Sequence, residues 1–199
     1  MIRPCDTRDF DTILAVINDA AAAYRAVIPE DRFHDPYMDA DALGRDIDAG
    51  VRFWGAEDGG ALIGVMGLQA VEDVTLIRHA YVRTVHRRRG VGGRLLAHLR
   101  ANHDRPFLIG TWAAAGWAVD FYRKHGFERV PDAQVAPLLR RYWSIPERQI
   151  QTSVVLADAT WRAAVSDRKG ETPCSVAYCL PVCSSCRPPA RPRWPTPTR

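Results

Sequence analysis

The chain has little of what marks disulfide-rich, membrane-spanning or secreted proteins. Its first 165 residues contain a single cysteine, Cys5, which excludes a disulfide scaffold for that part of the chain. No apolar run approaches the roughly 18 residues that a membrane helix needs. The first six residues lead directly into a polar stretch and lack the apolar core of a signal peptide. We therefore expect a cytoplasmic protein with no membrane partner.

Residues 1–165 also have no excess of positive charge. The net charge of the whole chain is +4, and residues 166–199 alone hold six basic and two acidic side chains. The first 165 residues are therefore formally neutral, and we expect no nucleic-acid partner for them. A basic arm that binds nucleic acid through the C-terminal segment is the minor alternative.

The C-terminal segment differs in composition from the rest of the chain. It holds half of the 14 prolines and four of the five cysteines, and such a segment cannot build a packed core. We therefore expect one domain over residues 1–165 and a disordered tail over residues 166–199. Four thiolates could bind zinc. Only Cys183 and Cys186 have the paired spacing of a zinc knuckle, however, and we expect no metal.

The spacing of apolar residues predicts an order of helices and strands. Helices are predicted at 7–27, 39–48, 90–102 and 116–125, with a weaker one at 134–142 that contains Pro137. Strands are predicted at 1–4, 51–57, 61–70, 74–83, 106–111 and 149–157. The second, third and fourth strands form an antiparallel meander. This order predicts an α/β protein with a mixed sheet of six or seven strands and helices on both faces.

A basic, glycine-rich stretch lies between the strand 74–83 and the helix 90–102. It reads Arg87-Arg88-Arg89-Gly90-Val91-Gly92-Gly93 and is followed by Arg94. Glycines let backbone N–H groups approach an anion closely, because no Cβ blocks the way. The helix start adds unpaired N–H donors and a partial positive charge, and the arginines add mobile cations. The stretch therefore suits a pyrophosphate.

This stretch has three alternative interpretations, and its sequence does not fit the last two of them. A plain glycine-rich turn on a basic, solvated surface is the simplest of them. A Rossmann site would need a third glycine where Leu95 stands, and the Gly-Lys-Ser/Thr of a P-loop is absent from the stretch.

Two motifs in the correct order resemble one family. Residues 81–96, from Tyr81-Val82 through the glycine stretch to Arg94-Leu95-Leu96, resemble the acetyl-CoA-binding motif of the GNAT superfamily of N-acetyltransferases. Residues 121–127, Phe-Tyr-Arg-Lys-His-Gly-Phe, are similar to the Y-x-x-x-G-F motif that follows it in the family. The resemblance covers about residues 1–157. It implies the acyl-CoA N-acyltransferase fold, in which a mostly antiparallel sheet splays between two central parallel strands, here 75–83 and 106–111.

The resemblance also implies where the co-substrate acetyl-CoA lies. The backbone of Val82 would pair with the pantetheine arm as a neighbouring strand does. The N–H groups of residues 88–93, among them those of Gly90, Val91, Gly92 and Gly93, would hold the pyrophosphate. The cations near the phosphates would be Arg87, Arg88, Arg89 and Arg94.

The implied reaction moves the acetyl group to a primary amine of a small molecule or peptide, by direct attack in a ternary complex. The resemblance makes Tyr122 the acid that protonates the leaving thiolate and the N–H of Val82 the donor to the oxyanion. A core tyrosine that packs with Trp117 and Phe121 is the alternative for Tyr122. A homodimer is left open.

The general base has no evident candidate. The positions that match the family's base are Leu76 and Arg78, and neither takes up a proton at pH 7. Strict alternation along residues 76–83 puts the even-numbered residues on one face and the odd-numbered ones, His79 among them, on the other. We therefore expect His79 to be structural. Glu72 and Asp73, on the preceding turn, are weaker candidates that could act through water.

Two departures from the family pattern bear on function. Arg78 in the place of a base suggests a residue that binds a carboxylate or phosphate of the substrate. Ala115 stands where family members often have an asparagine that contacts pantetheine. These departures leave a non-catalytic acyl-CoA-binding sensor of the same fold as the alternative function.

Overall fold

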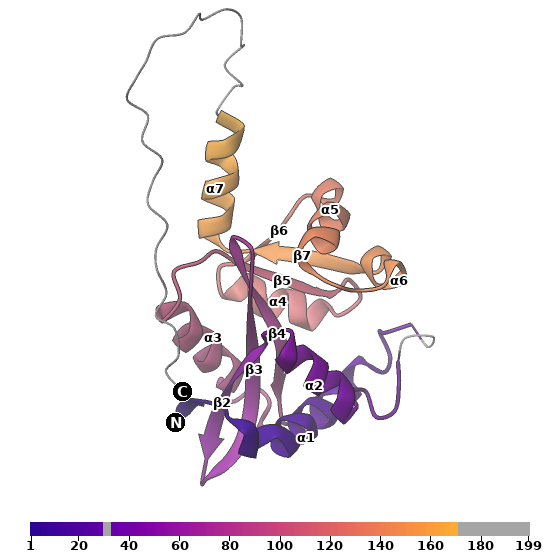
Figure 1. Cartoon of the computed structure of the whole chain (residues 1–199), viewed down its shortest axis with the longest axis vertical. Helices are drawn as coiled ribbons and strands as arrows, with labels where there is room; N and C mark the ends of the chain where they lie inside the picture. Colours follow the sequence, from indigo (N-terminus) through magenta and orange to yellow (C-terminus); the bar gives the residue numbers. More distant parts are fainter. Residues whose placement is uncertain (30–32, 171–199) are drawn as a thin grey trace, which may run out of the picture.

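The computed structural model describes residues 1–29 and 33–170 (Figure 1). Its helices are α1 (Phe10–Ala21), α2 (Ala40–Asp48), α3 (Val91–Ala101), α4 (Gly116–Lys124), α5 (Asp132–Tyr142), α6 (Glu147–Gln151) and α7 (Ala159–Gly170). Its strands are β1 (Ile2–Pro4), β2 (Arg52–Asp58), β3 (Ala61–Val71), β4 (Val74–Val82), β5 (Phe107–Trp112), β6 (Glu128–Arg129) and β7 (Ser153–Ala157). Turns of 3₁₀ helix flank α1 at Thr7–Asp9 and Ala22–Tyr24, and another follows β4 at Thr84–His86. Within the described ranges, no helix has the length and apolar character needed to cross a membrane.

The seven strands form one sheet in the order β1-β2-β3-β4-β5-β7-β6. β4 and β5 run parallel, and the other neighbouring strands in the described residues run antiparallel. The pairing of β4 with β5 ends at Ile77, opposite Ile109, whereas β4 itself continues to Val82. The two strands therefore part beyond Ile77. The predicted mixed sheet and its splay between the central parallel strands are both confirmed.

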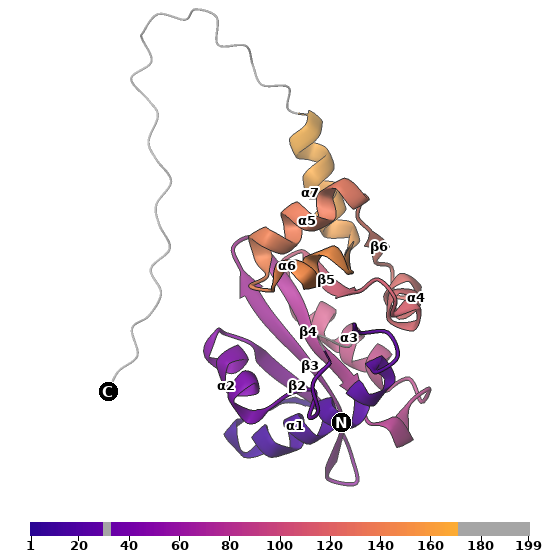
Figure 2. The ribbon, with the colours of Figure 1, turned by 90° about the vertical axis from the view of Figure 1, so that its right-hand side faces the viewer.

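Helices cover both faces of this sheet (Figures 1 and 2). On one face α3 and α4 pack over a core cluster that includes Met66, Ile77 and Ile109. On the opposite face α1 and α2 cover the N-terminal strands, where Val65 is buried beneath them. α5 and the start of α7 cover β5 and β7 on this second face. The opening between β4 and β5 therefore lies between two layers of helices.

A β-bulge interrupts β4 at His79. The register of β3 and β4 shifts between Val65 and Gly67, so that Met66 faces both His79 and Ala80. His79 has a left-handed φ of +50°. A bulge of this kind adds one residue to one strand and redirects the side chains that follow it.

The bulge reverses the alternation of side chains along β4. Ala80 and Val82 pack toward the α3 face, whereas Arg78 and His79 both reach Asp46 of α2 on the opposite face. The prediction from strict alternation is therefore wrong beyond Arg78. One extra residue moves every later side chain to the other face, because the period of a strand is two.

The segment 149–157 also differs from its predicted form. It begins in the short helix α6, which runs to Gln151, and only Ser153–Ala157 is strand. Pro146 precedes α6 and Ile150 is its buried residue. A single apolar residue fits one helical turn as well as it fits an alternating strand, so periodicity cannot separate the two here.

Helix α7 was not predicted and crosses the expected domain boundary at residue 165. Asp158 caps it by accepting a hydrogen bond from the N–H of Trp161 at 2.9 Å. The Trp161 side chain is buried against the cluster beneath α5. Residues 166–170 of the predicted tail thus continue this helix, and residues 171–199 lie outside the described residues.

Candidate active site

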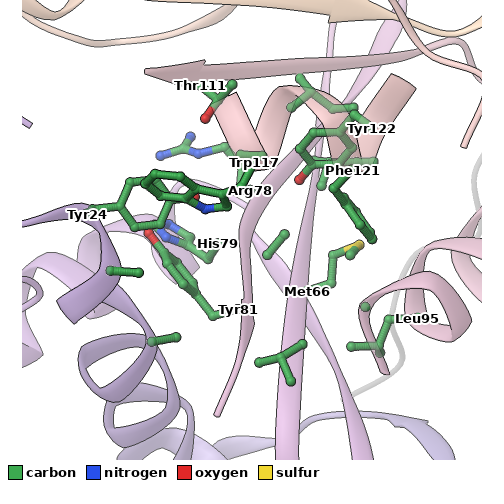
Figure 3. Close-up of a pocket in the computed structure, with 18 of the residues that line it drawn as sticks. Tyr24, Met66, Arg78, His79, Tyr81, Leu95, Thr111, Trp117, Phe121 and Tyr122 are labelled. Atoms are coloured by element: carbon green, nitrogen blue, oxygen red, sulfur yellow. The ribbon is translucent and has the colours of Figure 1, made fainter. Parts of the chain in front are cut away.

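A cavity of about 1000 Å³ opens where β4 and β5 part. Figure 3 shows its labelled side chains in two groups. We call one group the α3 half; it comprises Leu95, Phe121, Tyr122 and the glycine stretch. We call the other the α1 half; it comprises Tyr24, Tyr37, Arg78, His79, Tyr81 and Trp117. The two halves meet at the gap between the two strands.

The glycine stretch turns into α3 at one end of the α3 half. Gly90, just before α3, has a φ of +74°, a conformation that favours glycine. The N–H of Arg94 bonds to the Gly90 carbonyl at 3.0 Å and closes the first turn of the helix. The N–H groups of Val91, Gly92 and Gly93 precede that bond, and no side chain caps the helix start. Such a helix start is a suitable seat for an anion.

The predicted phosphate-binding residues do not all border the cavity. Those that line it are Val82, Arg87, Arg88, Gly90, Val91, Gly92 and Gly93. Arg89 and Arg94 are outside the lining, and the Arg94 guanidinium donates to the carbonyl of Arg89 at 3.0 Å. Two of the four arginines therefore lie where mobile side chains could meet phosphates.

Gly92 and Gly93 also have a packing role that sequence reasoning missed. A Cβ on Gly93 would lie 2.9 Å from His125 Nε2, and one on Gly92 would lie 3.4 Å from the Phe121 ring. Phe121 lies in the last turn of α4 and His125 directly follows that helix, and their rings lie 4.5 Å apart. The two glycines therefore let α4 close against α3. Only the spatial neighbours reveal this, because the partners are far apart in the sequence.

Tyr122 combines a buried ring with a hydroxyl on the cavity. Its side chain packs in the core with Phe121 and Phe127 at ring distances of 5.0 Å and 5.8 Å. Figure 3 shows the hydroxyl turned toward the interior of the cavity. Burial, with a smaller effect from Tyr24, raises the pKa of Tyr122, so the phenol stays protonated and can donate. The core tyrosine and the proton donor are thus compatible descriptions of one residue.

Asp46 of α2 joins two residues of the α1 half. Its Oδ2 lies 2.8 Å from His79 Nε2, and its Oδ1 accepts a hydrogen bond from Arg78 Nη2 at 3.1 Å. Arg78 also donates to Gln69 Oε1 at 2.7 Å. Burial favours the neutral acid, but the hydrogen bond from His79 and the charge of Arg78 outweigh it and lower the pKa of Asp46. The carboxylate is therefore charged at neutral pH.

This cluster changes the interpretation of both β4 residues. His79 lines the cavity on the same face as Arg78, not on the opposite face. The guanidinium of Arg78 already pairs with a carboxylate, so much of its charge is neutralised before a substrate anion arrives. Sequence reasoning missed Asp46, because 32 residues separate it from Arg78 and no local pattern marks it.

Aromatic rings form a continuous wall of the α1 half. The Tyr24 ring lies 5.3 Å from Trp117 and 6.2 Å from Tyr81, and Tyr81 lies 6.4 Å from Tyr37. Burial, followed by the neighbouring Tyr37, raises the pKa of Tyr24 to about 12. The same two causes raise the pKa of Tyr81. These hydroxyls are therefore neutral at physiological pH.

The remaining sequence candidates lie elsewhere. The Glu72 side chain accepts from Arg141, and Asp73 accepts from the Tyr142 hydroxyl at 2.7 Å. Both acids lie at the start of β4 and outside the lining of the cavity. Ala115 is fully buried in a small cluster with Trp112, and it offers no polar atom beyond its backbone.

Comparison with known proteins relates a central segment of the chain to one family. Residues 49–129 match the family model described as the acetyltransferase (GNAT) domain. This segment of the chain therefore resembles a GNAT acetyltransferase domain, and the predicted resemblance to that family is confirmed. No match was found among curated protein sequences.

Solved structures share the fold of this domain. The PaiA N-acetyltransferase from Thermoplasma acidophilum, in complex with coenzyme A, aligns with a TM-score of 0.60 and 15% identity, over 79% of this chain and 97% of that chain. A GNAT-family acetyltransferase from Staphylococcus aureus aligns with a TM-score of 0.59 and 16% identity, over 79% of this chain and 97% of that chain. The ribosomal-protein-alanine N-acetyltransferase from Brucella melitensis aligns with a TM-score of 0.56 and 18% identity, over 79% of this chain and 98% of that chain. At these identities the likeness extends to the fold alone.

The family match divides the cavity unevenly. The matched residues 49–129 include the glycine stretch and Tyr122, and so contain the whole α3 half. They leave out Tyr24, Tyr37 and Asp46, which belong to the α1 half or hold it in place. The match therefore covers the whole α3 half but only the part of the α1 half that β4 and α4 supply, and residues outside the match complete the α1 half.

Proposed function

We propose that the protein is an N-acetyltransferase that moves the acetyl group of acetyl-CoA to a primary amine by direct attack in a ternary complex. One observation carries this proposal. A single cavity connects the helix start of α3 with the α1 half through the gap between β4 and β5, and the Tyr122 hydroxyl faces its interior. A donor in the α3 half and an acceptor in the α1 half would meet at that gap.

The α3 half suits the phosphates and pantetheine of acetyl-CoA. The N–H groups of residues 91–93 and the side chains of Arg87 and Arg88 would hold the pyrophosphate. β4 has no β5 partner beyond Ile77, so its edge toward Val82 is available to pair with the pantetheine amides. The solved relative that holds coenzyme A has the same fold, which supports this assignment.

The reaction needs two protons to move. The neutral amine attacks the thioester carbon and its nitrogen gives up a proton to a base, the C–S bond breaks, and the thiolate takes a proton from an acid. Tyr122 is the assigned donor of that proton, because its buried phenol stays protonated. The N–H of Val82, at the free end of β4, is assigned to the oxyanion.

His79 is the assigned base. It lines the α1 half, where the acceptor amine would lie, and Asp46 holds its Nε2 at 2.8 Å. A proton on Nε2 bonded to the carboxylate leaves Nδ1 as an acceptor, and the carboxylate stabilises the imidazolium that forms. The missing base was one reason to consider a sensor, and this pair supplies a candidate.

The test is turnover. The purified chain is incubated with acetyl-CoA and a panel of primary amines and short peptides, and released thiol and acetylated product are both measured. We expect thiol release that depends on the acceptor and matches amide formation. Saturable acetyl-CoA binding with no thiol release on any acceptor would support the binding module instead.

A further inference from the structure

The α1 half also constrains the acceptor, if the proposed function holds. We propose that the acceptor is a primary amine on an aromatic or similarly flat apolar body that carries no carboxylate. This inference rests on the proposed function and concerns the part of the cavity that the amine would occupy. Two observations carry it, the aromatic wall and the occupied guanidinium.

The aromatic wall comes from four separate segments that meet at one place. Tyr24 ends the 3₁₀ turn after α1, Tyr37 lies in the loop before α2, Tyr81 is in β4 and Trp117 is in α4. Each ring contacts the next at 5.3 to 6.4 Å. Trp117 remains 43% exposed although it is a large apolar side chain. An aromatic body could stack on such a wall, and an ammonium group could lie over its ring faces.

Among the described residues of the α1 half, the one guanidinium is already paired with a carboxylate. Arg78 is its arginine, and both ends of the guanidinium are bonded, to Asp46 and to Gln69. Other basic side chains that line the described cavity, Arg87, Arg88 and Lys124, come from the glycine stretch and the end of α4. Arg87 lies close enough to affect Tyr24, but the bound phosphates would neutralise it. A carboxylate on the acceptor would therefore lose its hydration without gaining an unpaired cation among the described residues of this half.

The buried tyrosines keep this half uncharged apart from the cluster around Asp46. Burial raises the pKa values of Tyr24 and Tyr81, so neither hydroxyl becomes an anion that could attract a basic side chain of the acceptor. Such a site selects an amine by its ring and by the absence of further charge.

Three amines test the inference directly. 2-Phenylethylamine, phenylalanine and n-butylamine differ by one carboxylate or by one ring. We expect 2-phenylethylamine to have a specificity constant about tenfold or more above that of either other amine, the ratio that one misplaced or missing group typically produces. Equal values, or a preference for phenylalanine, would overturn the inference and leave the proposed function intact.

Two variants with a matched control connect the preference to the named residues. Trp117→Leu should lower the specificity constant for 2-phenylethylamine, divided by that for n-butylamine, about fivefold. Trp54→Leu is the control, because Trp54 packs toward α3 outside the cavity, and it should leave that ratio unchanged. Asp46→Asn releases Arg78 from its carboxylate partner. The specificity constant for phenylalanine, divided by that for 2-phenylethylamine, should therefore rise at least about fivefold, even as both rates fall. An unchanged ratio in Asp46→Asn would refute the role given to the neutralised guanidinium.

Failure of the function can be told from failure of the inference. If no amine gives thiol release, the proposed function fails. Calorimetric binding of 2-phenylethylamine and of phenylalanine to the protein saturated with coenzyme A then still measures the preference. Tighter binding of 2-phenylethylamine supports the inference, and equal or weaker binding contradicts it.

Discussion

Replacing His79 with glutamine isolates the proposed base from its structural role. The amide nitrogen of glutamine can take the place of Nε2, which lies 2.8 Å from Asp46, but it supplies no basic nitrogen. The ion pair of Asp46 with Arg78 remains, so we expect the fold to be kept. A positioned general base contributes about 10²- to 10⁴-fold to a rate. We expect kcat to fall about 100- to 1000-fold, or about 3 to 4 kcal/mol of barrier.

The pH dependence of this loss is the decisive measurement. Thiol release is followed at saturating acetyl-CoA from about pH 6 to about pH 10, the range in which a simple amine of pKa about 10 becomes deprotonated in solution. The variant should recover toward the wild-type rate at the alkaline end, because the amine then arrives without its proton. His34→Gln is the control, since His34 is exposed and outside the cavity. A loss below about threefold, or one that is equal at every pH, would refute the assignment.

Other parts of the proposal can be tested separately. Tyr122→Phe should lower kcat about 10- to 100-fold with little change in acetyl-CoA affinity, since only the hydroxyl is lost. Gly90→Ala puts a Cβ at a φ of +74°, which should destabilise this backbone conformation by about 1 to 2 kcal/mol. The expected result is weaker coenzyme A binding, measured by calorimetry. Removing residues 171–199 should leave the urea midpoint unchanged, whereas removing α7 as well takes away buried Trp161 and should cost about 3 to 5 kcal/mol. The pKa of Asp46 is lowered in the folded state, so its contribution to stability is present above the ordinary carboxyl pKa and is lost as pH falls through the lowered value. Asp46→Asn should therefore have a lower urea midpoint than wild type at neutral pH, and the two midpoints should match in strong acid.

Local features of the chain could be predicted because short segments determine them. The glycine stretch precedes a helix with a regular apolar face, and Gly126 follows α4 with a φ of +84°, a conformation that favours glycine after a helix. Apart from β6, α6 and α7, the order of strands and helices followed from periodicity, and the GNAT resemblance added the parallel pair at the centre. These features need little information from elsewhere in the chain.

Features that depend on distant partners could not be predicted. Asp46 meets His79 across 33 residues, and Gly93 lies against His125 of a different helix. Neither contact leaves a pattern in the sequence near the residues involved. The buried Trp161 shows the same limit, because its partners beneath α5 come from strands and helices earlier in the chain. The boundary that composition predicts at residue 165 falls inside α7.

The bulge at His79 explains why the α1 half was the part that the sequence concealed. It depends on the register between β3 and β4, and no glycine or proline in β4 marks it. With strict alternation, Arg78 would share its face with Ala80 and Val82, and His79 would point toward α3. The extra residue instead brings both to Asp46 and turns Tyr81 toward Tyr24 and Tyr37. The proposed base, the neutralised guanidinium and the aromatic wall therefore share one structural cause, and a change that removed the bulge should disturb all three together.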